Sequence, residues 1–197
     1  MQNYEIEPKE GFRESIRYEI HDGKIHNMAG ASTIHNEITG NIFNIFKNFL
    51  KGKKCRLFGE NENVIFKKHF RRFLPDIKIV CSPDKIKKDG IHGAPDLIAE
   101  VLSPGTELND LGYKKDVYEE NGVKEYWIIS PEAKSIVVYL LESGKYKIDN
   151  VYRALKDYEY EELTEEQKKR FKFEFKLSLG GFEDLTINVE EVFENVD

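Results

Sequence analysis

The sequence predicts an α/β protein with a mixed β-sheet flanked by helices, and three observations support this class. A helical pattern near the N-terminus is followed by several short strand patterns, and then by a second helical pattern and further strands. Residues 95–103, PDLIAEVLS, form a nearly unbroken apolar run, which is typical of a strand buried on both faces. The 197 residues contain no repeat and no Gly/Ser linker, so we expect residues 1–197 to form a single domain.

The first half of the chain contains patterns for a hairpin, a helix and three strands. Apolar and polar residues alternate on both sides of the Asp22-Gly23 pair, which predicts a β-hairpin. Isoleucine and phenylalanine residues with helical spacing follow Ser32 and Thr33, either of which is a candidate cap, and the pattern ends before Gly52. The hairpin is expected at 17–29, and the strands at 55–58, 63–66 and 76–81.

The second half continues from the apolar run with a polar loop and a helical pattern that ends at Asn121-Gly122. The next apolar segment, KEYWIIS, predicts another buried strand, in which Trp127 belongs to the core. A Ser143-Gly144 turn separates two further strand patterns. The expected strands are 124–130, 135–141, 145–153 and 173–179, and residues 157–172 are highly charged and expected as exposed helix or loop.

Charge is distributed unevenly around a net value of -6. Residues 30–91 contain 13 Lys/Arg and 6 Asp/Glu, a balance of +7, whereas residues 92–197 contain 13 and 24, a balance of -11. An acidic protein repels nucleic acid on average, but a local basic surface still binds phosphates. The basic third is therefore either a set of solvated lysine-rich loops or a phosphate-contacting surface. The candidate nucleic-acid-binding residues are Lys67, Lys68, Arg71 and Arg72.

Several protein classes are disfavoured. No apolar run approaches the roughly 20 residues that span a membrane, and residues 1–15 carry charges where a signal peptide needs an apolar stretch. Cys55 and Cys81 are too few for a disulfide framework or a zinc site, so we expect a cytoplasmic protein with reduced cysteines. The sequence contains none of the patterns GxxxxGK[ST], GxGxxG, GxSxG and HExxH.

Two acidic residues interrupt apolar strands. Asp76 follows Pro75 at the start of DIKIV, and Glu100 lies inside LIAEVL with 23 residues between the two acids. A buried carboxylate is costly unless it is protonated, paired with a cation or bound to a metal. Two carboxylates on adjacent strands can hold Mg²⁺ and leave positions for water and a phosphate oxygen. The acids therefore indicate a metal site that activates water for phosphodiester hydrolysis.

A lysine near such acids would stabilise the charge that develops on the phosphate. The position two residues after Glu100 is Leu102, so the strand does not supply this lysine, and Lys114 is the next candidate. Asp110, Lys114 and Tyr118 are four residues apart and share one face of the predicted helix. This stripe either points at Glu100 and forms a polar pocket, or is an ordinary ion pair on a surface helix.

Together these segments resemble the PD-(D/E)XK, or restriction-endonuclease-like, nuclease superfamily, and within it the Uma-type family of restriction endonucleases. The resemblance covers nearly the whole chain, and its most specific part is EVLSP, then Asp, Lys and Tyr four apart, then GVKEYW. It implies a restriction-endonuclease-like αβββαβ core with an extra N-terminal hairpin and C-terminal strands. The matching segments are YEIHDGKIHNMAGASTIHNEI, FLPDIKIV, APDLIAEVLSPGTELNDLGYKKDVYEENGVKEYWIISP and LGGFEDLTINVEEVF.

The resemblance also implies roles for individual residues. Asp76 and Glu100 would be the catalytic acids that bind Mg²⁺ or Mn²⁺, and Val101 would offer its backbone carbonyl to the same ion. Lys114 would be the catalytic lysine, displaced from the strand to the helix, with Lys115 as the alternative. The supporting positions are His35, Glu60, Ser103, Asp110 and Tyr118, of which His35 would either contact a phosphate or a metal-bound water, or be structural.

The function favoured by these observations is a Mg²⁺-dependent endonuclease that hydrolyses DNA phosphodiester bonds, as a homodimer if both strands are cut together. Only 7 of the 30 basic residues are arginines, the usual bidentate readers of guanine, so we expect weak sequence specificity. One alternative is a catalytically inactive nucleic-acid-binding or regulatory protein with the same fold. Another is a structural domain in which Asp76 and Glu100 are satisfied by Lys114. Two uncompensated carboxylates would raise one pKa, and a paired ion cluster would not.

Overall fold

The computed structural model describes residues 17–28 and 30–196. The charged N-terminal residues on which the signal-peptide expectation rests, and Ala29 at the end of the predicted hairpin, lie outside the described residues. A six-stranded central sheet consists, in spatial order, of β12 (Lys145–Arg153), β11 (Ser135–Glu142), β10 (Glu125–Ser130), β9 (Leu97–Val101), β6 (Ile77–Val80) and β3 (Arg56–Gly59). Strands β9 and β10 are parallel and the other neighbours are antiparallel, which confirms the predicted mixed sheet.

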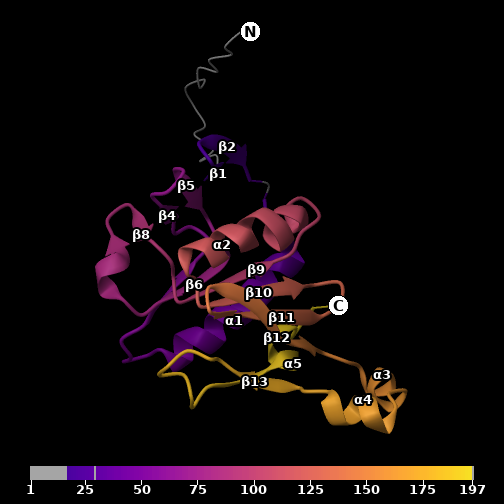
Figure 1. Ribbon diagram of the computed structural model, residues 1–197. Coiled ribbons are helices and arrows are strands. Elements are labelled where there is room, and N and C mark those ends of the chain that lie inside the picture. Colours follow the sequence, from indigo (N-terminus) through magenta and orange to yellow (C-terminus); the bar gives the residue numbers. More distant parts are fainter. Residues whose placement is uncertain (1–16, 29, 197) are drawn as a thin grey trace.

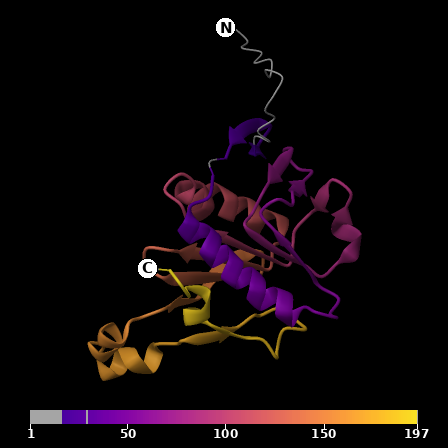
Figure 2. The ribbon, with the colours of Figure 1, turned by 180° about the vertical axis from the view of Figure 1, so that it is seen from behind.

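Helix α1 (Thr33–Phe49) covers one face of the central sheet, as Figure 2 shows. The Ser32 side chain caps it by accepting a hydrogen bond from the backbone N–H of His35 at 3.1 Å. Ile38, Ile42 and Phe46 form its buried stripe, in the predicted spacing. The helix ends before Gly52, whose φ of 78° is the left-handed conformation that glycine adopts most readily. The cap fixes the position of His35 at the N-terminal end of the helix.

The chain order α1, β3, β6, β9, α2 (Lys115–Asn121), β10 reproduces the expected αβββαβ core. Because β9 and β10 are parallel, the chain must cross over between them, and α2 makes this crossover on the face of the sheet opposite α1 (Figure 1). The helix ends at Gly122, with a φ of 85°, as the sequence predicted. It is preceded by a π-helical turn, η2 (Asn109–Lys114), for which the sequence shows no signal.

A second sheet of six shorter strands, the small sheet, lies on the same face of the central sheet as α2. Its strands, in spatial order, are β2 (Lys24–Asn27), β1 (Tyr18–His21), β5 (Arg71–Phe73), β4 (Val64–Phe66), β8 (Gly90–His92) and β7 (Ile86–Lys87), the last of which follows the 3₁₀ turn η1 (Pro83–Lys85). The predicted β1–β2 hairpin is confirmed, with a φ of 48° at Asp22 and 80° at Gly23. The small sheet and α2 share one apolar cluster with the central sheet, in which Phe73 packs against Tyr118.

The C-terminal segment, residues 175–196, packs on the α1 face of the central sheet. Helices α3 (Asp157–Glu161) and α4 (Glu165–Arg170) are largely exposed, as expected from their charge. They precede the β13 (Glu174–Lys176) and β14 (Thr186–Asn188) pair and the short helix α5 (Val189–Val192). Phe175 packs edge-on against Trp127, which is fully buried and therefore a core residue, as predicted. Within the described residues, no helix has the length and apolarity needed to cross a membrane.

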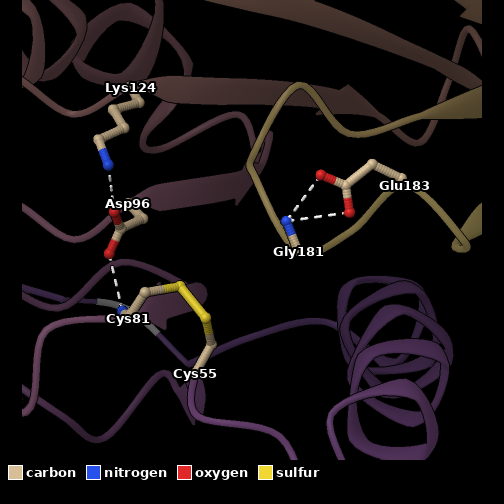
Figure 3. The surroundings of a disulfide bond; sticks show 6 residues. All are labelled: Cys55, Cys81, Asp96, Lys124, Gly181 and Glu183. Carbon is tan, nitrogen blue, oxygen red and sulfur yellow. Dashed lines mark hydrogen bonds and ion pairs between the residues drawn. A yellow bond between two sulfur atoms is a disulfide. The ribbon is translucent and has the colours of Figure 1, made fainter.

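The expectation of two reduced cysteines is wrong for this structure. Cys55 precedes β3 and Cys81 follows β6, and the two form a disulfide bond (Figure 3). Strands β3 and β6 are antiparallel with Arg56 opposite Val80, so the next pair outward is Cys55 and Cys81. Directly opposed residues have Cβ atoms close enough for an S–S bond. The pairing depends on the register of β3 and β6, which cannot be deduced from the number of cysteines.

The disulfide predicts a stability that depends on redox conditions. It closes a loop with a sequence separation of 26, for which the loss of unfolded-state entropy corresponds to about 3.5 kcal/mol. We therefore expect a thiol reductant to lower the free energy of unfolding by about that amount in urea titrations. The double variant Cys55→Ser/Cys81→Ser is the control and should be insensitive to the reductant. Identical stability of the wild type with and without reductant would contradict the prediction.

Candidate active site

The two acids that interrupt apolar strands lie side by side in the structure. Asp76 immediately precedes β6 and Glu100 is in β9, and the register that pairs Ile77 with Ala99 places the two acids next to each other. The backbone N–H of Asp76 donates to Glu100 Oε2 at 3.1 Å, and that of Val101 donates to Asp76 Oδ2 at 2.8 Å. Asp76 is 8% exposed and Glu100 2% exposed. Strand pairing therefore creates a nearly buried pair of carboxylates.

His35 contacts the first of these acids. Its Nε2 lies 3.1 Å from Asp76 Oδ2. Burial disfavours a charged imidazole, but the hydrogen bond and charge of Asp76 outweigh it and raise the pKa of His35 above its usual value. The other ring nitrogen, Nδ1, is buried and has no hydrogen-bond partner among the described residues. His35 thus adds a polar group beside Asp76 whose second nitrogen has an unsatisfied hydrogen-bonding capacity.

Lys114 is the lysine that reaches the acids. Its ammonium Nζ lies 2.8 Å from Glu100 Oε1, 3.1 Å from Asp110 Oδ1 and 3.2 Å from Glu19 Oε1. The three carboxylates raise the pKa of Lys114 well above its ordinary value, although burial alone would lower it. Lys115 instead lies over the ring of Tyr139 at 5.4 Å and is only half-buried. Of the two candidate lysines, the structure brings Lys114 to the carboxylates.

The predicted stripe of Asp110, Lys114 and Tyr118 faces Glu100. The Tyr118 hydroxyl donates to Glu100 Oε1 at 2.9 Å, the same oxygen that lies closest to Lys114. Asp110 and Lys114 belong to the π-helical turn, and the Tyr126 hydroxyl donates to the backbone oxygen of Asp110 at 3.0 Å. π-Helical turns inside helices are rare and are often found at functional sites. The geometry matches the pocket interpretation of the stripe rather than the surface ion pair.

Sequence reasoning missed Glu19, the fourth carboxylate of the cluster. It lies in β1, and its Oε1 contacts Lys114 and accepts the backbone N–H of Leu74 at 2.9 Å. Its Oε2 lies 2.9 Å from His21 Nε2. Burial alone would raise the pKa of Glu19, but Lys114, His21 and the Leu74 N–H lower it to about 2. The sequence signal is an acid inside the hairpin strand YEIH, but nothing local connects that hairpin to the other acids.

Lys78 was also missed. It lies in β6, two residues after Asp76, and is fully buried. Its ammonium donates to the backbone oxygens of Pro75 at 2.5 Å and Glu62 at 2.9 Å, and burial lowers the pKa of Lys78 to about 7. A lysine inside the apolar segment DIKIV is a signal of the same kind that singled out the two acids. Lys78 fixes the residue before Asp76 and adds a second cation near the carboxylates.

With every acid and lysine ionised, the buried cluster would carry more negative than positive charge. Four acids (Glu19, Asp76, Glu100 and Asp110) accompany two lysines (Lys78 and Lys114), a formal balance of -2 with neutral His35. Burial, together with Asp110, Asp76 and Glu19, raises the pKa of Glu100 to about 8 against the opposing effect of Lys114. The pKa of Asp110 is raised as well, mainly by burial. A divalent cation would compensate this excess, and hard carboxylate oxygens are the donors that Mg²⁺ prefers.

No three His, Cys, Asp or Glu side chains in the described part of the chain are arranged as a ready-made metal cluster. The residues fit a Mg²⁺ site of the open kind, in which one or two carboxylates bind the ion and water or substrate oxygens complete the shell. Asp76 and Glu100 are the two adjacent carboxylates of this kind. Asp76 also lines a surface pocket of about 340 Å³ together with Glu60 and residues of α1, so this acid of the pair borders open space.

The remaining supporting residues lie further from the chemistry. Glu60 Oε2 accepts a hydrogen bond from Arg17 at 2.9 Å on the rim of this pocket. The Ser103 hydroxyl pairs with that of Thr106 at 3.0 Å and shapes the loop between β9 and η2. Among the described contacts, neither side chain touches Asp76 or Glu100.

The four candidate nucleic-acid-binding residues lie on the β4–β5 hairpin. Arg71 is buried and pairs with Asp22 at 2.6 Å and Glu120 at 2.8 Å, and Lys68 also pairs with Glu120. Arg72 donates to the Asn63 side chain at 2.6 Å, and Lys67 is exposed. Two of these four cations are therefore neutralised by carboxylates of the protein itself.

This arrangement can be compared with known proteins. The sequence profile of the Uma2 family, described as "Putative restriction endonuclease", matches residues 2–173. The chain belongs to the Uma2 family. A relative in Synechocystis sp. (strain PCC 6803), the uncharacterized protein slr1290, is 30% identical over 128 residues, which are 64% of this chain and 67% of the relative.

A solved structure is similar to this chain in fold. The crystal structure of a "putative nuclease belonging to DUF820" from Anabaena variabilis superposes with a TM-score of 0.66. The match covers 91% of this chain and 90% of the other, at 17% sequence identity. The similarity in structure extends over nearly the whole molecule, which confirms the predicted fold class.

The raised pKa of Glu100 predicts a stability that falls as pH rises. The folded protein retains the Glu100 proton up to about pH 8, whereas an ordinary glutamate with a pKa of 4.5 has lost it. Because the folded state binds the extra proton between these values, the free energy of unfolding decreases by at most about 1.4 kcal/mol per pH unit. Urea titrations between about pH 5 and pH 7 should show a shallower decrease for Glu100→Gln than for the wild type.

Glu125 provides a matched control for this measurement. It lies at the start of β10, hydrogen-bonded to Trp127 and to the backbone of Ser178, and burial raises its pKa to about 7. Glu125→Gln should remove a separate part of the same pH dependence, and the double variant should remove both parts. A Glu100→Gln protein with the full wild-type slope would show that Glu100 is ionised in the folded state.

Proposed function

We propose that this protein is a Mg²⁺-dependent endonuclease that hydrolyses DNA phosphodiester bonds. The observation that carries the proposal is the buried Asp76–Glu100 pair with Lys114 at 2.8 Å from Glu100. Membership in a family described as restriction endonucleases, and a nuclease-like fold, support the same reaction class. Mn²⁺ is a second candidate ion, because its preference for oxygen ligands resembles that of Mg²⁺.

Asp76 and Glu100 would bind the ion, with the backbone carbonyl of Val101 as a third ligand. When bound, the ion would supply an activated water and charge stabilisation at the phosphate. The protein prepares both acids for this task. The Val101 N–H and His35 orient Asp76, and the Tyr118 hydroxyl and the Asp76 N–H orient Glu100. Acids held in this way need little reorganisation when substrate enters, which lowers the barrier of the chemical step.

Lys114 would stabilise the negative charge that develops on the scissile phosphate. Its raised pKa keeps it cationic at neutral pH, and Glu19 and Asp110 hold the ammonium beside Glu100. His35 borders Asp76 and would donate a hydrogen bond to a phosphate oxygen or a water. Glu19 and Asp110 are positioning residues in this scheme, since they act through Lys114.

DNA is the proposed partner, held by the basic β4–β5 hairpin and by Lys67 in particular. We also propose a homodimer, because two sites are needed to cut both strands together. The proposed location is the cytoplasm. Reduction of the disulfide there would leave the acids in place, because Cys81 and Asp76 lie at opposite ends of β6.

One observation favours the second candidate, an inactive nucleic-acid-binding or regulatory protein. Lys114 already contacts three carboxylates, as in a self-contained ion cluster. The raised pKa of Glu100 weighs against it, because an acid selected only for pairing with Lys114 would be ionised rather than protonated at neutral pH. Carboxylates next to a DNA-binding surface also repel phosphate unless a cation lies between them.

Plasmid nicking tests the proposal. The wild type should nick supercoiled DNA with Mg²⁺ or Mn²⁺ and not with EDTA. Asp76→Ala, Glu100→Ala and Lys114→Ala should each reduce the rate by about 100-fold or more, because each removes a group that acts directly in the transition state. Lys115→Ala is the matched control for Lys114→Ala, and it should retain activity because Lys115 lies against Tyr139.

The set of variants that lose nicking shows which residue assignment is wrong. Loss of nicking in Lys115→Ala with retention in Lys114→Ala would make Lys115 the catalytic lysine. Nicking that persists in EDTA, or in both acid variants, would contradict metal-dependent cleavage at this site.

A further inference from the structure

The tip of the β4–β5 hairpin presents an aromatic side chain to solvent. β4 and β5 are joined by the four residues Lys67–Phe70, and Phe70 is 67% exposed. The backbone φ is 60° at His69 and 50° at Phe70. Bulky residues rarely adopt this left-handed conformation, which persists only where surrounding structure enforces it. An exposed phenylalanine therefore stands at a position where a glycine would be expected.

Four contacts hold this tip in place. The backbone oxygen of Phe70 accepts the N–H of Gly23 at 3.3 Å, which joins the tip to the β1–β2 turn. Arg71 pairs with Asp22 in that turn and with Glu120 in α2. Lys68 pairs with the other carboxylate oxygen of Glu120. The basic residues thus anchor the tip to the helix that follows Lys114, and Phe70 projects from a fixed support.

The surroundings of Phe70 are cationic. The segment KKHFRR supplies four formal positive charges, and the carboxylates paired with it are Asp22 and Glu120. Lys67 and His69 beside Phe70 are exposed, and so is Lys24, which follows Gly23 on the neighbouring hairpin. An exposed aromatic ring among cations is the composition of surfaces that contact phosphates with the cations and stack bases on the ring. This charge complementarity selects nucleic acid over an apolar protein partner.

We propose that Phe70 stacks on an opened base of the DNA bound at the Asp76–Glu100 site. This inference rests on the proposed function, because it takes DNA as the substrate. Asp76 follows Phe70 by six residues of extended chain, so their Cα atoms are at most about 20 Å apart. At about 3.4 Å per base step, the ring reaches a base within roughly six positions of the bond to be cut. Phe70 therefore acts at the DNA bases, away from the reacting phosphate.

The test is DNA binding with Ca²⁺ in place of Mg²⁺, measured by fluorescence anisotropy on duplexes with and without one unpaired base. Phe70→Ala should weaken binding about 5- to 150-fold, the range for loss of one stacked base. Phe70→Trp should restore it, with quenching of the new tryptophan fluorescence on binding. Ile25→Ala is the matched control, because Ile25 is 68% exposed on the neighbouring hairpin, and it should bind like the wild type.

Salt dependence separates stacking from phosphate contact. Phe70→Ala should leave the slope of log K against log salt unchanged, whereas Lys67→Ala should make it shallower by about 1. Phe70→Gly tests folding, since glycine suits a φ of 50° and should give a melting temperature no lower than that of Phe70→Ala. Reduced binding in a variant with undiminished stability supports a role at the DNA.

The outcomes distinguish this inference from the proposed function. If Phe70→Ala binds DNA as tightly as the wild type, the stacking role is overturned and the nuclease proposal still stands. Binding that depends on Phe70 without cleavage by the wild type supports stacking and overturns the nuclease. A wild type that binds none of these DNAs overturns both.

Discussion

The contact on which the rest of this structure depends is the Lys114 ammonium among three buried carboxylates. Glu19 comes from the small sheet, Glu100 from the central sheet, and Asp110 from the same π-helical turn as Lys114. One cation therefore joins both sheets to the crossover helix. Burial of four acids is tolerable because this lysine and Lys78 compensate part of their charge. The negative charge that remains next to Asp76 makes the site suited to a divalent ion.

The arrangement of the sheets turns local features into a site. Antiparallel pairing of β6 with β9 sets Asp76 beside Glu100, and the parallel pairing of β9 with β10 requires the crossover that carries Lys114 and Tyr118 over the same point. The small sheet supplies Glu19, which contacts Lys114. It also contains the β4–β5 hairpin that bears Phe70. The proposed catalytic residues and the proposed DNA contact at Phe70 therefore belong to one connected set of strands.

The sequence predicted the features that have strong local signals. Helix α1 and strands β9 to β12 are long enough to show their periodicity, and an acid inside an apolar strand is visible without a structure. Glu19 was missed because its contact with Lys114 spans 95 positions. Of the small sheet, the sequence predicted β1, β2 and β4 but not β5, β7 and β8, which have only two or three residues each. The disulfide depends on the register of β3 and β6. The pairing of Arg71 with Glu120 likewise depends on tertiary structure and has no local sequence signal.

The most direct test of the proposed metal site is a crystal structure of the wild type with Mn²⁺, using the anomalous signal of the metal. The account predicts one peak at about 2.0–2.2 Å from a carboxylate oxygen of both Asp76 and Glu100, with Val101 as a backbone ligand. The same peak should be absent from Glu100→Gln crystals. A saturated Mn²⁺ soak with no peak at these acids, and with Lys114 still in contact with Glu100, would contradict the account.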